Sequence, residues 1–179
     1  MDSHRIIAIA GTPGCGKTTL CTALHDAGFV VETVVDLASK HGCLGDEDPS
    51  DGAAPVDVHK LAELWEDESD GLLFVDGHLS HLLDVDAVVL LRCHPDQLRM
   101  RLQERDYAEA KITANVEWEM LGGTWSEMLE FELDTPVLEL NTTEATSEAS
   151  TLQILEWIEA GCPADGIETA ATEAIDWLA

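Results

Sequence analysis

Residues 11–18 read Gly11-Thr12-Pro13-Gly14-Cys15-Gly16-Lys17-Thr18, which matches the pattern G-x-x-x-x-G-K-[ST] at every fixed position. An apolar run, Arg5 to Ala10, precedes this stretch, and a segment with the apolar spacing of a helix follows it. Glycines in such a loop permit positive φ angles, so successive N–H groups can surround phosphate oxygens. The alternative, an accidental Gly-rich turn, leaves the strand before it and the helix after it unexplained. The sequence therefore predicts a loop that binds a nucleoside triphosphate.

Each part of this loop has an expected role. Lys17 should reach the β- and γ-phosphates, and Thr18 should bind Mg²⁺ as the cofactor of the nucleotide. The helix that follows directs the positive end of its dipole at the same anion. The predicted ATP-binding residues of the loop are Gly14, Cys15, Gly16, Lys17, Thr18 and Thr19.

The composition is strongly acidic. Nine Lys and Arg stand against 36 Asp and Glu, which gives a formal net charge of −27. Charges of one sign destabilise a compact fold, and salt screens them over a Debye length of about 3 Å at 1 M. We therefore expect a halophilic protein, because an apolar content of 45% argues against acidic disorder. The same charge argues against direct nucleic-acid binding, which depends on Lys and Arg.

The cysteines and the apolar runs indicate the cellular compartment. Five cysteines form no C-x-x-C pair and are odd in number, which favours a reducing cytosol. Nothing resembles a signal peptide, and no apolar run approaches the ~20 residues of a membrane span. We therefore expect a cytoplasmic protein without a membrane partner.

Strand-like and helix-like segments alternate along the chain. Strands are expected at 6–10, 29–34, 72–75, 87–91 and 137–140. Helices are expected at 17–27, 56–66, 95–104 and 148–159, and a further helix is expected in the tail from 166. A short helix should begin at Asp36, which would be its cap, and a longer one should run from 108 with an interruption at Gly122-Gly123. Residues 42–55 are expected to form a loop. This alternation predicts one α/β domain over residues 1–179, with a parallel sheet covered by helices on both faces.

The few cations are clustered. Arg92, Arg99, Arg101, Arg105 and Lys111 fall within twenty residues, whereas residues 112–179 contain 15 Asp or Glu and no Lys, Arg or His. P-loop enzymes commonly place an Arg over the transferring phosphoryl group, so Arg105, with Arg101 one helical turn before it, is the candidate. The alternative for each Arg is a surface ion pair, and for Arg99 the two interpretations are equally good.

An acidic residue and a histidine follow the third expected strand. Asp76 ends the run Leu72 to Val75 and is placed to hold Mg²⁺ through water. His78 would lie on the same side, where a neutral imidazole could orient or deprotonate an attacking water. The alternative is a loop histidine with ordinary partners, and that interpretation is kept for His81.

Several of these motifs together resemble one family. They are the Thr12-Pro13-Gly14 start of the loop, Asp36-Leu37-Ala38, Asp76-x-His78, Val89 to Arg92, and Leu102-x-x-Arg105-x-Tyr107-x-x-x-Lys111-x-x-x-Asn115. Over about residues 5–160 the chain is similar to the archaeal adenylate kinase relatives of eukaryotic nuclear adenylate kinase isoenzyme six. The resemblance implies a nucleoside monophosphate kinase fold with a five-stranded parallel sheet. It also implies a monophosphate-binding region near 33–52 and a lid near 104–114 with Arg105 on ATP. Beyond the similar part, the sequence itself predicts an acidic helical tail at 161–179.

The resemblance also implies an activity. Family members transfer phosphate between ATP and AMP, hydrolyse ATP, and assist late maturation of the small ribosomal subunit and its rRNA by holding a basic ribosomal protein. Lys17, Asp76, His78 and Arg105 are the catalytic residues expected here, with Asp36 and Lys40 on the monophosphate. Where relatives carry Asp-Leu-Ala-Arg, however, this chain has Ser39-Lys40, and Lys40 stands about 100° further around the helix.

Two hypotheses therefore remain. The first is a kinase acting on AMP or another nucleoside monophosphate, and the second is an assembly-factor ATPase with little or no AMP kinase activity. A shikimate- or gluconate-type kinase is a third alternative, disfavoured because no polyol pocket signature is visible.

Overall fold

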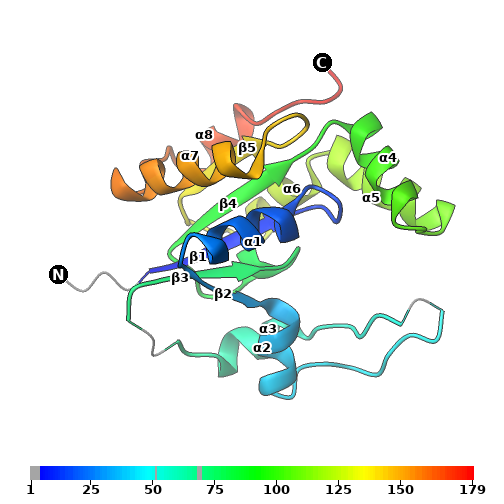
Figure 1. Ribbon diagram of the computed structural model, residues 1–179, viewed down its shortest axis with the longest axis horizontal. Helices are drawn as coiled ribbons and strands as arrows, with labels where there is room; N and C mark the ends of the chain where they lie inside the picture. Colours follow the sequence, from blue (N-terminus) through cyan, green and yellow to red (C-terminus); the bar gives the residue numbers. More distant parts are fainter. Residues whose placement is uncertain (1–4, 51, 68–69) are drawn as a thin grey trace.

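The computed structural model describes residues 5–50, 52–67 and 70–179. At its centre lies a five-stranded parallel sheet in the order β2-β3-β1-β4-β5 (Figure 1). The strands are β1 (Arg5–Gly11), β2 (Val30–Thr33), β3 (Leu72–Asp76), β4 (Ala87–Arg92) and β5 (Val137–Asn141). The predicted α/β fold with a parallel sheet is therefore confirmed, and β1 is its middle strand.

Helices cover both faces of the sheet. They are α1 (Lys17–Asp26), α2 (Val34–Lys40), α3 (Val58–Leu64), α4 (Pro95–Glu104), α5 (Glu109–Met120), α6 (Gly123–Glu130), α7 (Ser147–Glu159) and α8 (Ile167–Thr172), with a 3-10 turn at Ser80–Leu82. In Figure 1, α1 and α7 lie on one face, and α6 and α8 on the other. None of the helices in the described part of the chain is long and apolar enough to cross a bilayer.

The central strand shows how the sequence separates the two faces. Ile7 and Ile9 are fully buried in the cluster that holds the inward residues of α1 and α7. Ala8 and Ala10 point the other way and pack with Trp125 of α6. Because both faces are buried, the strand is a continuous apolar run rather than an alternation of apolar and polar residues.

The start of α2 corrects one prediction. Asp36 does not cap this helix, because Thr33 is the cap and its hydroxyl accepts from the Asp36 N–H at 3.0 Å. The helix begins directly after β2 with no intervening loop, so the cap falls on the last residue of the strand. Asp36 is instead the third residue of the helix, where its negative charge favours the positive end of the dipole.

Two other boundaries follow from the sequence. Gly122 adopts φ +62 between α5 and α6, so the predicted interruption at Gly122-Gly123 is confirmed. In the described part of residues 43–57 the chain forms an arm without helix, in which an antiparallel bridge joins Leu44 and Val56 and the Gly45 N–H donates to the Pro55 carbonyl at 2.8 Å. This arm extends away from α2 and α3 in Figure 1. All five cysteines are free and buried.

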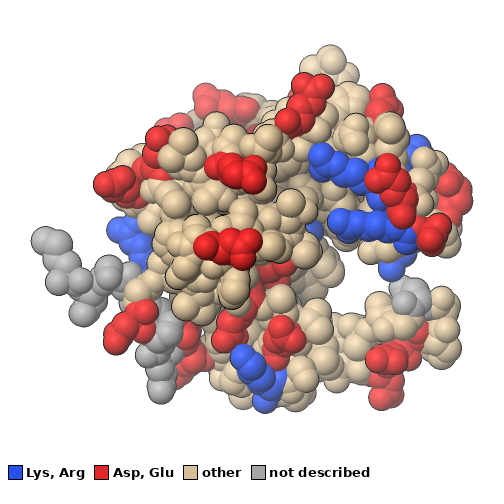
Figure 2. All heavy atoms as spheres, viewed as in Figure 1, with Lys and Arg blue, Asp and Glu red and all other residues tan. Residues whose placement is uncertain are grey.

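The strong negative charge gives a first test. Acidic side chains are spread over the face in Figure 2, whereas Lys and Arg gather mostly over α4 and α5. We expect the melting temperature to rise by at least about 5 °C between about 0.05 M and about 2 M KCl, because salt screens the repulsion among carboxylates. Scanning calorimetry measures this rise, with sucrose of equal osmolality as an uncharged control. An equal melting temperature at both salt concentrations would contradict the halophilic interpretation.

Candidate functional site

The loop of residues 11–16 leads from β1 into α1 at the carboxyl end of the sheet. Gly14 and Gly16 adopt φ +93 and φ +97, which is the region that glycine enters freely. Gly14 also needs its missing side chain, because a Cβ there would lie 2.8 Å from a methyl group of Leu98. The Cys15 N–H donates to the Thr12 carbonyl at 3.1 Å and closes the turn, while the Cys15 side chain is buried in the core.

Side chains from two other elements hold the back of this loop. The Thr142 hydroxyl, just after β5, donates to the Cys15 carbonyl at 2.6 Å. Arg101 on α4 donates to the Gly14 carbonyl at 3.3 Å and to the carbonyls of Thr142 and Thr143 at 2.9 and 3.2 Å. Arg101, which the sequence analysis placed beside Arg105 as a phosphate candidate, therefore supports the loop backbone.

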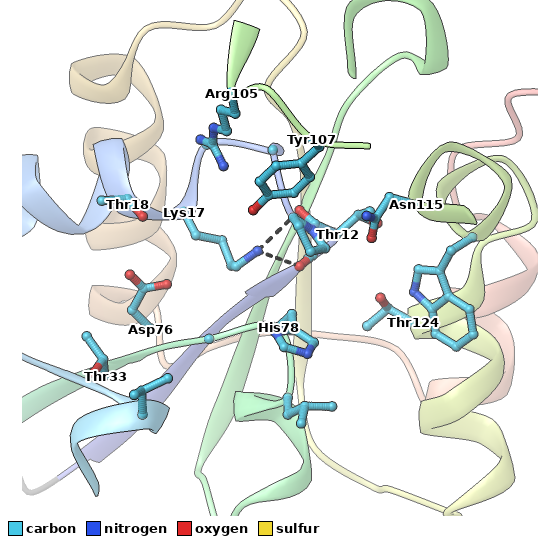
Figure 3. Close-up of a pocket in the computed structure, with 18 of the residues that line it drawn as sticks. Thr12, Lys17, Thr18, Thr33, Asp76, His78, Arg105, Tyr107, Asn115 and Thr124 are labelled. Atoms are coloured by element: carbon cyan, nitrogen blue, oxygen red, sulfur yellow. Dashed lines mark hydrogen bonds between the residues drawn. The ribbon is translucent and has the colours of Figure 1, made fainter. Parts of the chain in front are cut away.

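Lys17 lies across the front of the loop (Figure 3). Its ammonium donates to the Gly11 carbonyl at 2.6 Å and to the Thr12 carbonyl at 3.2 Å. Burial lowers the pKa of Lys17, the Cys15 and Asp76 side chains oppose this shift, and the charge of Arg105 adds to it. A cation held in this position is suited to an anion with several negative charges.

A cavity of about 840 Å³ opens over the loop. Of the predicted residues it is lined by Gly14, Gly16, Lys17, Thr18, Asp76, His78 and Arg105. Thr19 lines a neighbouring cavity of about 470 Å³, which shares Gly16 and Arg105 with the first and also contains Arg101 and Thr142. The structure thus brings the predicted residues of three separate segments together, and Arg105 at the end of α4 lies between the two cavities.

Two oxygen ligands suited to Mg²⁺ line the larger cavity. They are the hydroxyl of Thr18 and the carboxylate of Asp76, which Figure 3 shows on the same side of the loop. Burial raises the pKa of Asp76, whereas the Lys17 charge and a hydrogen bond from the Cys21 thiol lower it. Among the described residues no three His, Cys, Asp or Glu side chains gather to hold a metal alone. The pair therefore fits an ion that takes its other ligands from phosphate and water.

His78 lies where the 840 Å³ cavity over the loop meets a third cavity, which the 43–57 arm lines. Desolvation and the Lys17 charge lower the pKa of His78, so its imidazole is neutral at pH 7. His81 is not exposed loop: it is 1% exposed, and its Nε2 lies 2.6 Å from the Glu127 carboxylate. The ordinary-partner interpretation of His81 holds for Nε2 only, because Nδ1 is buried and has no hydrogen-bond partner among the described residues. Glu127 also lines the cavity over the loop.

The structure does not bring the two predicted monophosphate residues into this cavity. Asp36 and Lys40 are absent from the described residues that line it, and the Lys40 ammonium pairs with Glu32 at 3.2 Å. From the same region, Thr33 and Val35 do line it. Monophosphate binding by Asp36 and Lys40 stays a prediction.

Sequence reasoning also missed part of the lining. Eight lining residues were given no individual site role: Thr12, Thr33, Tyr107, Lys111, Asn115, Trp118, Thr124 and Glu127. Tyr107, Lys111 and Asn115 stood in the motif that carries the resemblance, and Lys111 and Asn115, four residues apart, share a face of α5. Lys111 lies 4.7 Å from the centre of the Tyr107 ring and adds a third cation to Lys17 and Arg105.

Two remaining arginines of the cluster have other partners. Arg99 pairs with Glu109 at 2.6 Å on the surface, which is the alternative considered for it. Arg92 is 2% exposed and pairs with Glu119 at 2.8 Å and Glu139 at 2.6 Å. The surface ion pair considered for each Arg is therefore wrong for Arg92, because this side chain is buried and faces the buried Glu119 and the half-buried Glu139.

Comparison with known proteins places this site in a family. Residues 7–122 match the family described as AAA domain. The chain is 41% identical over 175 residues to a protein of Archaeoglobus fulgidus named "Putative adenylate kinase", covering 97% of this chain and 92% of that one. Proteins of the same name are 40% identical in Pyrococcus abyssi (87% and 85% covered) and 30% identical in Methanocaldococcus jannaschii (96% of each).

Solved structures show the same fold. Shikimate kinase from Acinetobacter baumannii, solved with shikimate, superposes with a TM-score of 0.59 at 14% identity, covering 89% of this chain and 96% of that one. The YorR protein of Bacillus subtilis, solved with phosphorylated GDP, gives a TM-score of 0.53 at 17% identity, covering 87% and 96%. At these identities the likeness concerns the fold alone.

Lys17 gives the first test of the site. Lys17→Ala should reduce nucleotide turnover by at least about 100-fold, because it removes a charge aimed at phosphate. Its circular dichroism should match that of the unchanged protein. Lys60→Ala is the matched control, since Lys60 lies on α3, outside the cavity lining, and donates to the Gly42 carbonyl. Turnover of Lys17→Ala close to that of Lys60→Ala would refute the assignment of the loop.

Proposed function

This chain belongs to the AAA-domain family and to the archaeal proteins named "Putative adenylate kinase", and from that membership we propose that it transfers the γ-phosphoryl group of ATP to AMP. One observation carries the proposal. A single cavity contains the P-loop residues, Thr18 and Asp76 together with Thr33 and Val35 from the region next to β2. A nucleoside triphosphate and a second phosphorylated molecule can therefore meet in one cavity, which is what direct transfer requires.

The donor side is the more complete half. The phosphates of ATP would lie on the loop, and its base and ribose would extend into the neighbouring cavity that Thr19 and Thr142 line. Figure 3 shows Arg105 and Lys17 near the loop, one from the end of α4 and the other from α1. Both cations can neutralise charge on the transferring group without moving far. Thr18 and Asp76 would hold Mg²⁺, and the ion would supply further positive charge to the phosphates when bound.

The reaction itself needs positioning more than covalent chemistry. A phosphate oxygen of AMP attacks the γ-phosphorus, the bond from that phosphorus to the β,γ-bridging oxygen breaks, and two molecules of ADP result. Negative charge is spread over the transferring oxygens as this happens. The residues proposed as catalytic, Lys17, Asp76, His78 and Arg105, line one cavity and come from three segments: the start of α1, the end of β3 and the residues after it, and the end of α4.

The acceptor phosphate needs a cation, and the chain offers two. Lys40, at the end of α2, carries the charge nearest in sequence to the position where the resemblance expects an Arg. Lys111 is the better placed, because it lines the cavity at the start of α5 and its charge contributes to lowering the pKa of His78. We propose that Lys111 is the main cation that pairs with the phosphate of AMP. Lys40 and Asp36 stay candidates for AMP binding at the edge of the 33–52 region, outside the cavity lining.

A second candidate function is ATP hydrolysis. The position of His78 favours it, because a neutral imidazole in the same cavity as Lys17 and Asp76 can accept a proton from water. In this version the enzyme is an assembly-factor ATPase that acts in late small-subunit maturation and releases a basic ribosomal protein. The net charge of −27 supports a basic partner electrostatically.

His78 separates the two reactions. His78→Ala should reduce ATP hydrolysis by about 100-fold, because general-base help to water is lost. Formation of ADP from ATP and AMP should change less than about threefold, because that reaction uses no water. The two rates are measured separately at high salt, with His59→Ala on α3 as the control. Equal losses of both activities in His78→Ala would contradict water positioning. Hydrolysis without any AMP-dependent turnover in the unchanged protein would leave the ATPase as the surviving function.

The two lysines give a test of the acceptor site. Lys111→Ala should raise KM for AMP by about tenfold, because a charge within the cavity is lost, while Lys40→Ala should raise it by less than about threefold. Steady-state ADP formation at varied AMP and saturating ATP measures both. The KM for ATP is the internal control for Lys40→Ala. A larger effect of Lys40→Ala than of Lys111→Ala would return the acceptor phosphate to α2.

A further inference from the structure

A buried carboxylate lies behind the nucleotide-binding loop. Glu119 on α5 is 3% exposed, and both of its oxygens accept hydrogen bonds. Its Oε2 accepts from the Thr12 hydroxyl at 2.6 Å. Its Oε1 accepts from Arg92 Nε at 2.8 Å, from the Cys93 N–H at 3.1 Å and from Trp177 Nε1 at 3.0 Å. Four donors is close to the full capacity of a carboxylate, so Glu119 is fixed in one orientation.

The C-terminal segment, residues 173–179, completes this arrangement. Besides the Trp177 bond to Glu119, the Ile175 N–H donates to Glu139 at 2.9 Å and the Ile175 carbonyl accepts from Arg92 at 3.3 Å. The Trp177 ring centre lies 5.8 Å from the Arg92 guanidinium carbon. The acidic side chains of this segment take no part in these contacts. Its backbone and the Trp177 N–H instead contact the ion pairs that Arg92 forms with Glu119 and Glu139.

The network reaches the nucleotide site through one residue. The Thr12 hydroxyl is held by Glu119, and the Thr12 carbonyl accepts from Lys17 Nζ and from the Cys15 N–H. The orientation of Thr12 therefore affects both the cation that faces the phosphates and the turn that follows. Thr12 itself lines the large cavity.

We propose that Trp177 is a positioning residue for ATP, acting through Glu119 and Thr12 on the phosphate-binding loop. Without the indole N–H, Glu119 keeps Arg92 and Cys93 as partners, so the carboxylate stays buried and paired. It loses the third donor to Oε1, and its hold on the Thr12 hydroxyl weakens. The proposal rests on the assignment of this loop to ATP and gives the C-terminal segment a part in that site.

Trp177→Phe tests the proposal, because phenylalanine keeps an aromatic ring and removes the N–H donor, while the smaller ring also loses some packing, for which the control below corrects. ATP binding to the unchanged protein and the variant is measured by titration calorimetry at high salt, and KM for ATP by steady-state turnover. We expect Kd and KM for ATP to rise by about fivefold to tenfold, with kcat within about twofold. Trp157→Phe is the matched control, since Trp157 Nε1 donates to the Pro163 carbonyl at 2.8 Å, outside this network. It should lose thermal stability without a change in Kd.

A double-mutant cycle tests the route. Thr12→Val removes the hydroxyl that Glu119 holds, so adding Trp177→Phe to it should raise Kd for ATP no further. The proposal is overturned if Trp177→Phe lowers only the melting temperature, or if its effect on Kd persists in the Thr12→Val background. Failure of the unchanged protein to bind ATP would instead refute the proposed function, which the same titration shows directly.

Discussion

The carbonyl oxygens of the phosphate-binding loop are the constraint on which the site depends. When successive N–H groups of a loop point at an anion, the carbonyl groups of the same peptides point back into the protein and need donors. Here the Cys15 carbonyl receives the Thr142 hydroxyl, and the Gly14 carbonyl receives Arg101. One donor directly follows β5 and the other lies on α4, far along the chain from the loop. The conformation of the loop therefore depends on these distant segments as well as on its own sequence.

This constraint explains where a chain with nine Lys and Arg places them. Arg101 donates to the loop backbone, and Arg92 pairs with the buried Glu119 and the half-buried Glu139. Lys17, Arg105 and Lys111 remain on the cavity. A buried guanidinium with two carboxylates adds little net stability, because desolvation offsets the attraction. Its value lies in specificity, since it fixes Glu119 between the loop and the C-terminal segment.

The sequence predicted the parts of the fold that depend on local pattern. The apolar strand before Gly11, the helix after it and the break at Gly122 are confirmed, because each follows from periodicity or from a required φ angle. It failed where the partner of a side chain could not be inferred from local pattern: Arg101 was a phosphate candidate beside Arg105, Arg92 was given a surface ion pair as its alternative, and Asp36 was predicted as a cap that Thr33 provides instead. One signal was available, since Glu119 shares the apolar face of Ile112 and Val116 on α5, and a lone carboxylate on such a face needs a buried partner. The roles of Asp76, His78 and Arg105 rest on placement in one cavity and remain predictions.

The uneven placement of charge affects how fast a nucleotide arrives. ATP is an anion, and over most directions it approaches a surface that repels it, since the net charge is −27. The Lys and Arg over α4 and α5 in Figure 2 offer one attractive side. ATP therefore reaches the protein mainly from that side. Added salt weakens the long-range repulsion between ATP and the acidic surface more than it weakens the short contacts within the cavity. Association of ATP with this protein should speed up as salt is added, the reverse of the usual behaviour of electrostatically steered pairs.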